Sequence, residues 1–184
     1  MNSPRIEPKP GIEQAKADGA LPIEAAVDLT DIDTLTATQA ACVDAAVAGR
    51  DVLAVISTGG AKSAIYQLTG AAVPGPTLVV VPLLALADDQ MAGIEATELP
   101  RAGAIDGRTS TADRQRICDQ VRQGRLEYLF TTPEILQNDR LRRELETCRF
   151  SLFVVDEAHC VVTWGQSFRS AYLYLGEVRS RLGS

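Results

Sequence analysis

Residues 154–160 read Val-Val-Asp-Glu-Ala-His-Cys, an apolar run that ends in two adjacent carboxylates and a histidine. Far upstream, residues 51–63 read Asp-Val-Leu-Ala-Val-Ile-Ser-Thr-Gly-Gly-Ala-Lys-Ser, a second apolar run followed by a glycine-rich turn. A glycine-rich turn with Lys-Ser cradles phosphates on backbone N–H groups when it joins a strand to a helix. An apolar strand that ends in Asp-Glu holds Mg²⁺ and positions water. Together the two segments predict a site for a nucleoside triphosphate.

Two residues of the glycine-rich turn have a defined chemistry in such a site. Lys62 would reach the β- and γ-phosphates, and the hydroxyl of Ser63 would bind Mg²⁺. Each segment also has an ordinary interpretation, because the turn fits the start of any helix and two acids fit a helix N-cap. The presence of both segments, in this order along the chain, makes the ordinary interpretations the weaker ones.

The composition limits the class of protein. The chain has 184 residues, enough for one buried core, and its 46% hydrophobic and 23% charged residues are ordinary for a globular protein. Its longest apolar run, residues 78–87, contains Pro82 and is too short to span a bilayer. We therefore expect no membrane segment and a cytoplasmic protein.

Charge and metal-ligand types narrow the function further. The net charge is −6. An acidic chain lacks the broad positive surface that supplies most non-specific affinity for nucleic acids, so any DNA site must be a local groove. The four cysteines have no paired metal-ligand spacing, and His159 is the only histidine. We expect no zinc site and interpret the cysteines as small buried side chains in a reducing compartment.

The apolar pattern predicts an α/β fold. Four short, continuous apolar runs occupy residues 51–56, 77–83, 126–131 and 150–155. Continuous runs indicate strands that are buried on both faces, as in a parallel sheet, and the segments between them have helical patterns. The sites of such folds lie at the carboxyl ends of the strands.

Three of the intervening helices have recognisable limits. Thr38 can cap a helix through Ala48 that Gly49 would end, and Ser110 with Asp113 can cap a helix that ends before Gly124. Residues 134–148 predict one amphipathic helix. The basic cluster on that helix indicates a solvated face rather than a DNA contact; its members are Arg140, Arg142 and Arg143.

Further motifs extend the two segments into a family pattern. They are Leu35-Thr36-Ala37-Thr38-Gln39, Ala48-Gly49-Arg50-Asp51, Tyr66-Gln67-Leu68, Pro82-Leu83 with Asp89-Gln90, Thr132-Pro133-Glu134, and Trp164-Gly165 with Phe168-Arg169. On these residues the chain resembles the first RecA-like lobe of RecQ-type DNA helicases, in the DExH branch of helicase superfamily 2. The resemblance covers residues 35–175. It implies a P-loop NTPase lobe with a mainly parallel sheet flanked by helices.

The resemblance also implies roles for individual residues. Gln39 would recognise adenine, and the phosphate loop would hold ATP through Thr58, Gly59, Gly60, Ala61, Lys62 and Ser63. Ser63 and Asp156 would hold Mg²⁺, and Glu157 would orient or deprotonate the attacking water, so that Glu157, Asp156 and Lys62 form the catalytic set. Four residues would couple single-stranded DNA to ATP hydrolysis: His159, Trp164, Phe168 and Arg169. Base stacking on the two aromatic side chains contributes about 1–3 kcal/mol per base, and plain core packing is their alternative role.

Several departures from the family pattern fall at these functional positions. Ala61 stands where the family has a glycine, and a Cβ there hinders close approach of the backbone to a ligand. Asp88 stands where a basic residue is common, and Gln166, Ser167 and Ser170 alter the aromatic loop. We predict weakened binding of nucleotide and weakened coupling to DNA.

The resemblance implies an incomplete lobe. The family's next strand motif and its second RecA-like lobe, with an arginine finger, do not follow before residue 184. We expect residues 1–33 to be a flexible N-terminal segment and residues 34–184 to be a partial helicase ATP-binding domain.

The predicted function is the ATP-binding portion of a RecQ-like, ATP-dependent 3′-to-5′ DNA helicase that uses ATP and Mg²⁺. The expected partners are single-stranded or partially duplex DNA, bound weakly by this chain alone, and a second RecA-like lobe in trans. One alternative is a non-catalytic nucleotide- or DNA-binding module. Another is a small P-loop kinase or GTPase, although Asp-Glu-Ala-His with the 164–172 loop argues against that class.

Overall fold

Four short strands form one parallel sheet in the computed structural model, which describes residues 23–30, 32, 34–57, 62–96, 101–163 and 166–182. The strand order is β2 (Arg101–Ile105), β3 (Leu126–Thr131), β1 (Thr77–Val80) and β4 (Leu152–Val155). Every residue of β1 and β3 is buried, as the continuous apolar runs predict. The residues of β4 are only half-buried, and β4 pairs with β1 alone within the described chain.

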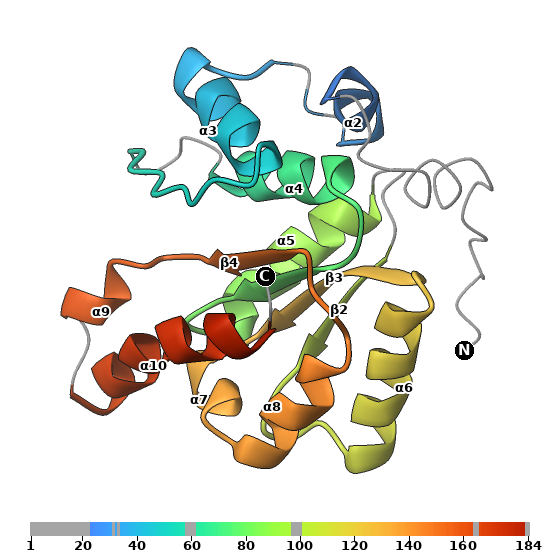
Figure 1. Ribbon diagram of the computed structural model, residues 1–184, viewed down its shortest axis with the longest axis vertical. Helices are drawn as coiled ribbons and strands as arrows, with labels where there is room; N and C mark the ends of the chain where they lie inside the picture. The colour runs from blue at the N-terminus through green and yellow to red at the C-terminus, as the bar shows by residue number, and fades with distance from the viewer. Residues whose placement is uncertain are drawn as a thin grey trace.

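Helices cover both faces of the sheet (Figure 1). One face carries α2 (Ile23–Thr30), α3 (Ala37–Val47), α4 (Lys62–Ala72) and α5 (Leu84–Glu95). The other face carries α6 (Thr111–Arg122), α7 (Pro133–Leu136), α8 (Asp139–Glu146) and α10 (Gln166–Leu182), and short α9 (Cys160–Thr163) lies between β4 and α10. Leu78 and Val80 of β1 face the second group, whereas Val79 and Val81 face the first. The predicted α/β class with a parallel sheet is confirmed.

Residues 51–57 are the main correction to the predicted fold. The run predicted as a strand forms no strand in the structure. The side chains of Leu53 and Val55 are 81% and 85% exposed. A strand needs a hydrogen-bonded neighbour, and no described segment pairs with these residues.

The predicted helix limits are partly confirmed. Ser110 caps α6 by accepting a hydrogen bond from the Asp113 N–H at 3.1 Å, as predicted. The cap of α3 is Thr36 rather than Thr38, because the Thr36 hydroxyl accepts from the Gln39 N–H and the Gln39 side chain accepts from the Thr36 N–H. Gly49 follows α3 with a φ of 73°, as predicted.

The single helix predicted over residues 134–148 is wrong, because the chain forms α7 and then α8. Asn138 starts the second helix by accepting from the N–H groups of Arg140 and Leu141. The solvated face predicted for the arginines of this region is wrong for Arg142, which is 4% exposed. Its guanidinium donates to the Tyr174 hydroxyl at 2.5 Å and pairs with Asp139 at 2.7 Å.

The segment expected to be flexible, residues 1–33, includes helix α2. Ala26 and Thr30 of this helix are buried, and α2 packs against α4. Residues 1–22 lie outside the described part of the chain. Among the described residues, no helix is both long enough and apolar enough to cross a membrane.

Candidate functional site

The charged residues predicted as catalytic meet at one edge of the sheet. Lys62 is the first residue of α4, and Asp156 and Glu157 directly follow β4. The Asp156 N–H donates to the Val80 carbonyl at 2.8 Å, which extends the β1–β4 pairing by one residue and fixes the start of the acidic pair. The Lys62 Nζ lies 3.2 Å from Glu157 Oε1, with side chains that are 32% and 29% exposed. The sequence prediction that these residues come together is consistent with this geometry.

Glu157 lies between a cation and an imidazole. Its Oε1 contacts Lys62, and its Oε2 lies 3.0 Å from Nδ1 of His159, whose side chain is largely exposed. The backbone of Glu157 has a φ of 48°, in the left-handed region that non-glycine residues rarely adopt. Such a conformation costs about 1–2 kcal/mol in an L-residue. Backbone strain of this kind concentrates at functional sites, so we take Glu157 as the centre of the candidate site.

A chain of hydrogen bonds runs from the core to Asp156. The Tyr66 hydroxyl donates to Gln90 Oε1 at 2.5 Å, and Gln90 Nε2 donates to Asp156 Oδ2 at 3.1 Å. Burial raises the pKa of Tyr66, and the nearby Asp156 charge raises it further, so the hydroxyl stays protonated as a donor. Asp156 Oδ1 accepts from the Glu157 N–H at 2.8 Å. Both carboxylate oxygens are therefore oriented by the protein.

Tyr66 and Gln90 were absent from the predicted site. Both belong to sequence motifs that the resemblance already includes, Tyr66-Gln67-Leu68 and Asp89-Gln90. Membership in these motifs could have identified both residues as site candidates. Their contacts could not be predicted, because Tyr66 and Gln90 are 24 positions apart in sequence and Gln90 and Asp156 are 66 positions apart.

The remaining predicted residues are placed as follows. Ser63 is the second residue of α4 and is half-buried. Gln39 is buried, and its Oε1 accepts from the Thr36 N–H at 2.8 Å and the Thr36 hydroxyl at 3.0 Å. Its predicted role toward adenine stays a prediction. Outside the described residues lie Thr58, Gly59, Gly60, Ala61 and Trp164, together with the side chains of Phe168 and Arg169.

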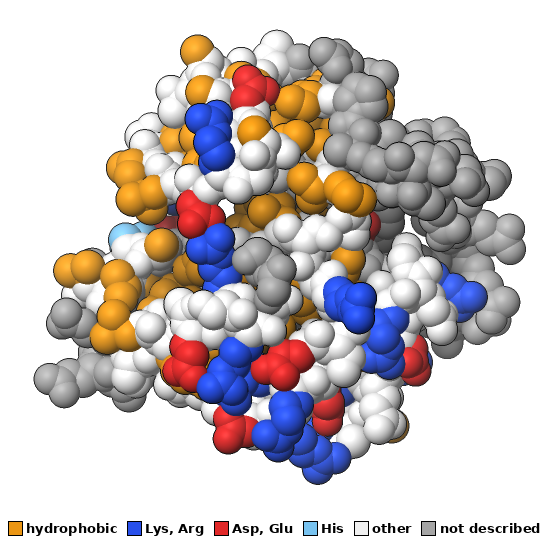
Figure 2. Space-filling view, viewed as in Figure 1, with side chains coloured by type: hydrophobic (Ala, Val, Ile, Leu, Met, Phe, Trp, Pro, Cys, Tyr) orange, Lys and Arg blue, Asp and Glu red, His pale blue; other side chains and the backbone are white. Residues whose placement is uncertain are grey.

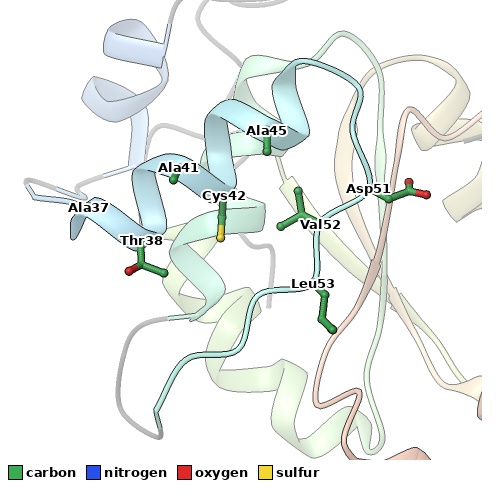
Figure 3. Close-up of a pocket in the computed structure, with 8 residues that line it drawn as sticks. All are labelled: Ala37, Thr38, Ala41, Cys42, Ala45, Asp51, Val52 and Leu53. Carbon is green, nitrogen blue, oxygen red and sulfur yellow. The ribbon is translucent and has the colours of Figure 1, made fainter.

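The charged cluster is separate from a large hollow in the described molecule. This hollow, of about 560 Å³, lies between α3 and residues 51–53, with Cys42, Val52 and Leu53 among its walls (Figure 3). Its lining contains none of Lys62, Asp156 and Glu157. The candidate site is therefore defined by its charged groups and not by the hollow.

The donor set fits a metal–nucleotide complex better than a metal held by protein alone. In the described chain no three His, Cys, Asp or Glu side chains gather as a metal site. Mg²⁺ usually takes only one or two carboxylates from the protein and completes its octahedron with water and phosphate oxygens. The Asp156 oxygens each retain a lone pair beyond the hydrogen bond described above. A lysine ammonium next to such a carboxylate can bind the phosphates of a nucleotide.

Comparisons with known proteins identify the family of the chain. The family model for DEAD/DEAH box helicases matches residues 36–181. The chain is 38% identical over 141 residues to a protein of Bacillus subtilis named "probable ATP-dependent DNA helicase RecS", covering 77% of this chain and 28% of that protein. It is 39% identical over 147 residues to the ATP-dependent DNA helicase RecQ of Synechocystis, covering 79% of this chain and 30% of that protein.

A solved structure shares the fold. The crystal structure of the DUF1998 helicase MrfA bound to DNA and AMPPNP aligns with a TM-score of 0.66 at 22% identity, over 97% of this chain and 26% of that one. The chain thus spans less than a third of the length of the relatives described here.

Proposed function

The chain belongs to the DEAD/DEAH box helicase family, and from this premise we propose that it is the ATP-binding portion of a RecQ-like, ATP-dependent DNA helicase. The observation that carries the proposal is the convergence of Lys62, Asp156 and Glu157 at the carboxyl edge of the sheet. In the whole protein, ATP hydrolysis would drive 3′-to-5′ movement on single-stranded DNA. The RecQ and RecS relatives, which are named as DNA helicases, support the DNA part of the proposal.

Three side chains would hold the nucleotide and its metal. Lys62 would neutralise the phosphates, and the Ser63 hydroxyl with the Asp156 carboxylate would hold Mg²⁺. Bound Mg²⁺ supplies charge neutralisation to the phosphates during transfer. Gln90 and Tyr66 would act as positioning residues, because their hydrogen bonds fix the rotation of the Asp156 carboxylate.

Glu157 would take the proton of the attacking water. In the structure its carboxylate is paired with Lys62, so it can serve as a base only when that cation turns to phosphate. The pair is about one-third exposed, and pairs of this kind contribute about 0–1 kcal/mol. Arrival of a triphosphate would therefore exchange one weak ion pair for a stronger contact and release the base.

His159 would link this centre to DNA. It contacts Glu157 on one side and precedes α9 and α10 on the other. The residues that follow it, Trp164, Phe168 and Arg169, would contact bases and phosphates, as the family resemblance implies. Movement of the Glu157 carboxylate, or a change in its charge, would alter the position or charge of His159 through the 3.0 Å contact between them.

A non-catalytic module that binds nucleotide or DNA weakly is the second candidate. The observation that favours it is Ala61, which stands where phosphate loops of this family have glycine. If Ala61 blocks the approach of phosphate, the chain retains the fold of an ATPase lobe without its ligand.

Titration of Mg²⁺-ATP by calorimetry separates the two candidates. The native chain is compared with Ala61→Gly, Lys62→Ala and Glu157→Gln, and Glu95→Gln, which alters an exposed acid at the far end of α5, is the matched control. We expect Lys62→Ala to weaken binding at least ~10-fold, since a phosphate contact of a lysine is a charge-assisted hydrogen bond. Glu157→Gln should bind as well as the native chain or up to about fivefold tighter, because Lys62 loses its competing partner.

The remaining outcomes are equally decisive. Binding by Ala61→Gly alone would favour the non-catalytic module. If no variant binds nucleotide while circular dichroism shows folded protein, the proposed site is wrong. DNA-stimulated ATPase activity, measured after addition of a separately produced second lobe, tests the catalytic part.

A further inference from the structure

Two cysteines meet on the face of the sheet opposite α4. Cys118 lies in α6, Cys148 follows α8, and both are buried. The Cys148 Sγ lies 4.0 Å from the Cys118 carbonyl oxygen and 4.0 Å from the Glu144 carbonyl oxygen. The Cys148 thiol therefore lies directly against the backbone of Cys118. Thirty positions apart in sequence, these thiols are neighbours only because α6 packs against α8.

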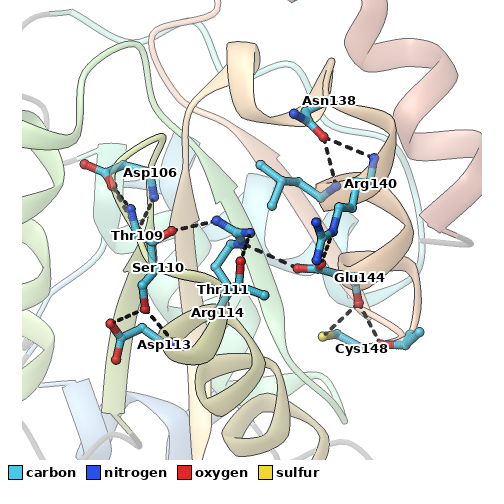
Figure 4. Close-up of polar contacts among 12 residues, drawn as sticks. Asp106, Thr109, Ser110, Thr111, Asp113, Arg114, Asn138, Arg140, Glu144 and Cys148 are labelled. Carbon is cyan, nitrogen blue, oxygen red and sulfur yellow. Dashed lines mark hydrogen bonds and ion pairs between the residues drawn. The ribbon is translucent and has the colours of Figure 1, made fainter.

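A basic pocket opens onto this pair. It has a volume of about 390 Å³ and Cys118 in its wall. Its other lining residues are Gln115, Arg122, Arg140, Arg143, Glu144 and Thr147. Glu144 is already shared by Arg114 and Arg140, at 3.4 Å each, as Figure 4 shows beside Cys148. Arg143 is exposed and has no ion pair with another described residue. Arg122 pairs with Asp119 and Arg140 with Glu144, so the charge of Arg143 is the one that favours a small anionic molecule in the pocket.

The two thiols differ in reactivity. Interaction with the neighbouring Cys148 thiol lowers the pKa of Cys118, and the positive charge of Arg122 acts in the same direction, against burial and the negative charges of Glu144 and Asp119. Interaction with Cys118, together with burial, raises the pKa of Cys148. Cys118 also lines the pocket and Cys148 does not, so an entering oxidant meets Cys118 first and Cys148 reacts second.

We propose that Cys118 and Cys148 form a reversible dithiol site that is oxidised to a disulfide by a small anionic disulfide entering the basic pocket. The Cys118 thiolate attacks one sulfur of the oxidant, whose S–S bond breaks and releases one thiolate. Cys148 then loses its proton to solvent and attacks the Cys118 sulfur of the mixed disulfide, which releases the second thiolate. Two protein thiols are oxidised, and the one oxidant disulfide is reduced to two thiols.

The location gives this bond a structural consequence. Cys148 lies between α8 and β4, and β4 ends at the acidic pair of the candidate site. A disulfide would tie α6 to the segment that enters β4. The proposal does not depend on nucleotide binding, because every contact that carries it lies on the α6–α8 side of the sheet.

Oxidised glutathione is the probe that tests the site. The full chain is incubated with it under native conditions, and the products are followed by intact mass and by peptide mapping without reduction. We expect the loss of two hydrogens, a cross-linked peptide that joins residues 118 and 148, and full reversal by dithiothreitol. A Cys148→Ala variant should trap one glutathionyl group on Cys118, whereas Cys118→Ala should leave Cys148 unmodified.

Two results would overturn the proposal. One is native protein in which Cys118 and Cys148 stay reduced while the half-buried Cys42 reacts. The other is a 118–148 cross-link that forms only in denaturant. If a cysteine variant does not fold, early time points of the native chain decide, since the glutathionyl group must appear on Cys118 before the cross-link does.

A charge test examines the pocket itself. We expect Arg143→Gln to slow the reaction with oxidised glutathione several-fold and to leave the reaction with uncharged bis(2-hydroxyethyl) disulfide unchanged. Arg149→Gln, which changes an exposed arginine that does not line the pocket, is the matched control and should affect neither reaction. Equal slowing with both reagents would show that the pocket does not select an anion, and would overturn that part of the proposal.

Discussion

Two apolar runs of similar composition have opposite fates in this molecule. Residues 77–81 form β1 and its continuation, and Leu78 to Val81 are fully buried between β3 and β4 and beneath helices on both faces. Residues 51–57 form no strand, and the side chains of Leu53 and Val55 are largely exposed. Hydrophobic side chains, orange in Figure 2, lie on the face of the molecule shown there, and some of them lie between the upper and lower parts of the view.

The two runs differ in structure because of the segments that lie beside them and not because of their own sequences. A continuous apolar segment indicates that a strand can be buried on both faces, but pairing partners must come from elsewhere in the chain. β1 has a partner on each side. Residues 51–53 have α3 on one side, across the hollow of about 560 Å³ (Figure 3). Asp51, the first residue of this run, pairs with Arg179 of α10.

Hydrogen exchange should give the largest contrast between the two runs. Amides of β1 can exchange only through large-scale unfolding, so we expect protection of ~10³-fold or more, whereas amides of 52–57 should exchange almost as in a free peptide. Mass spectrometry of the native chain measures both in one experiment. Equal protection would mean that the second run has a partner in solution.

A matched pair of leucine substitutions should differ by several kcal/mol in the free energy of unfolding. Leu78→Ala removes a fully buried side chain and should cost about 2–5 kcal/mol. Leu53→Ala removes an exposed side chain and should change stability by less than about 0.5 kcal/mol. Urea denaturation followed by circular dichroism gives both values. A large cost for Leu53→Ala would contradict the exposed position of this run.

Two helical glycines extend the contrast to the helices next to the runs. A Cβ at Gly70 of α4 would lie 2.6 Å from Thr77 Oγ1 and 2.8 Å from Tyr128 Cε1, so Gly70→Ala should cost about 1–3 kcal/mol. A Cβ at Gly93 of α5 would meet nothing within 4 Å, so Gly93→Ala should stabilise the helix by about 0.5–1 kcal/mol. Thermal unfolding of both variants should shift in opposite directions, and shifts of the same sign would refute the close approach of α4 to β1.

The smallest expected effect concerns the ion pair that holds the start of residues 51–57. Arg179 Nη1 lies 2.9 Å from Asp51 Oδ2, and both side chains are exposed. A double-mutant cycle with Asp51→Asn and Arg179→Gln should give a coupling energy of about 0–1 kcal/mol that decreases with added salt. A larger, salt-independent coupling would indicate that the pair is desolvated in solution.

Most of the sheet could be predicted from sequence because three of the four apolar runs find partners within the chain. Strand β2 was missed because it reads Arg-Ala-Gly-Ala-Ile, without the bulky residues that indicate a strand. At Gly103 of this strand, a Cβ would lie 2.6 Å from Leu126 Cδ1 of the neighbouring strand.

The site was predictable to a similar extent. Lys62, Asp156 and Glu157 could be brought together from sequence, since parallel strands end at the same edge of a sheet. The contacts of Gln90 with Tyr66 and Asp156 depend on where α5 lies against α4 and β4, which no local pattern specifies. The capping role of Gln39 was missed because Thr36 and Thr38 are equally suitable residues for an N-cap.

The left-handed backbone of Glu157 sets stability and chemistry against each other at one position. Glycine adopts this conformation without the strain that a Cβ imposes, so Glu157→Gly would relax the turn after β4 while removing the carboxylate between Lys62 and His159. Selection for a more stable fold alone would favour glycine there. A search for thermostable variants of this chain should therefore recover glycine at position 157, and the gain would come from the residue that the proposed chemistry needs most.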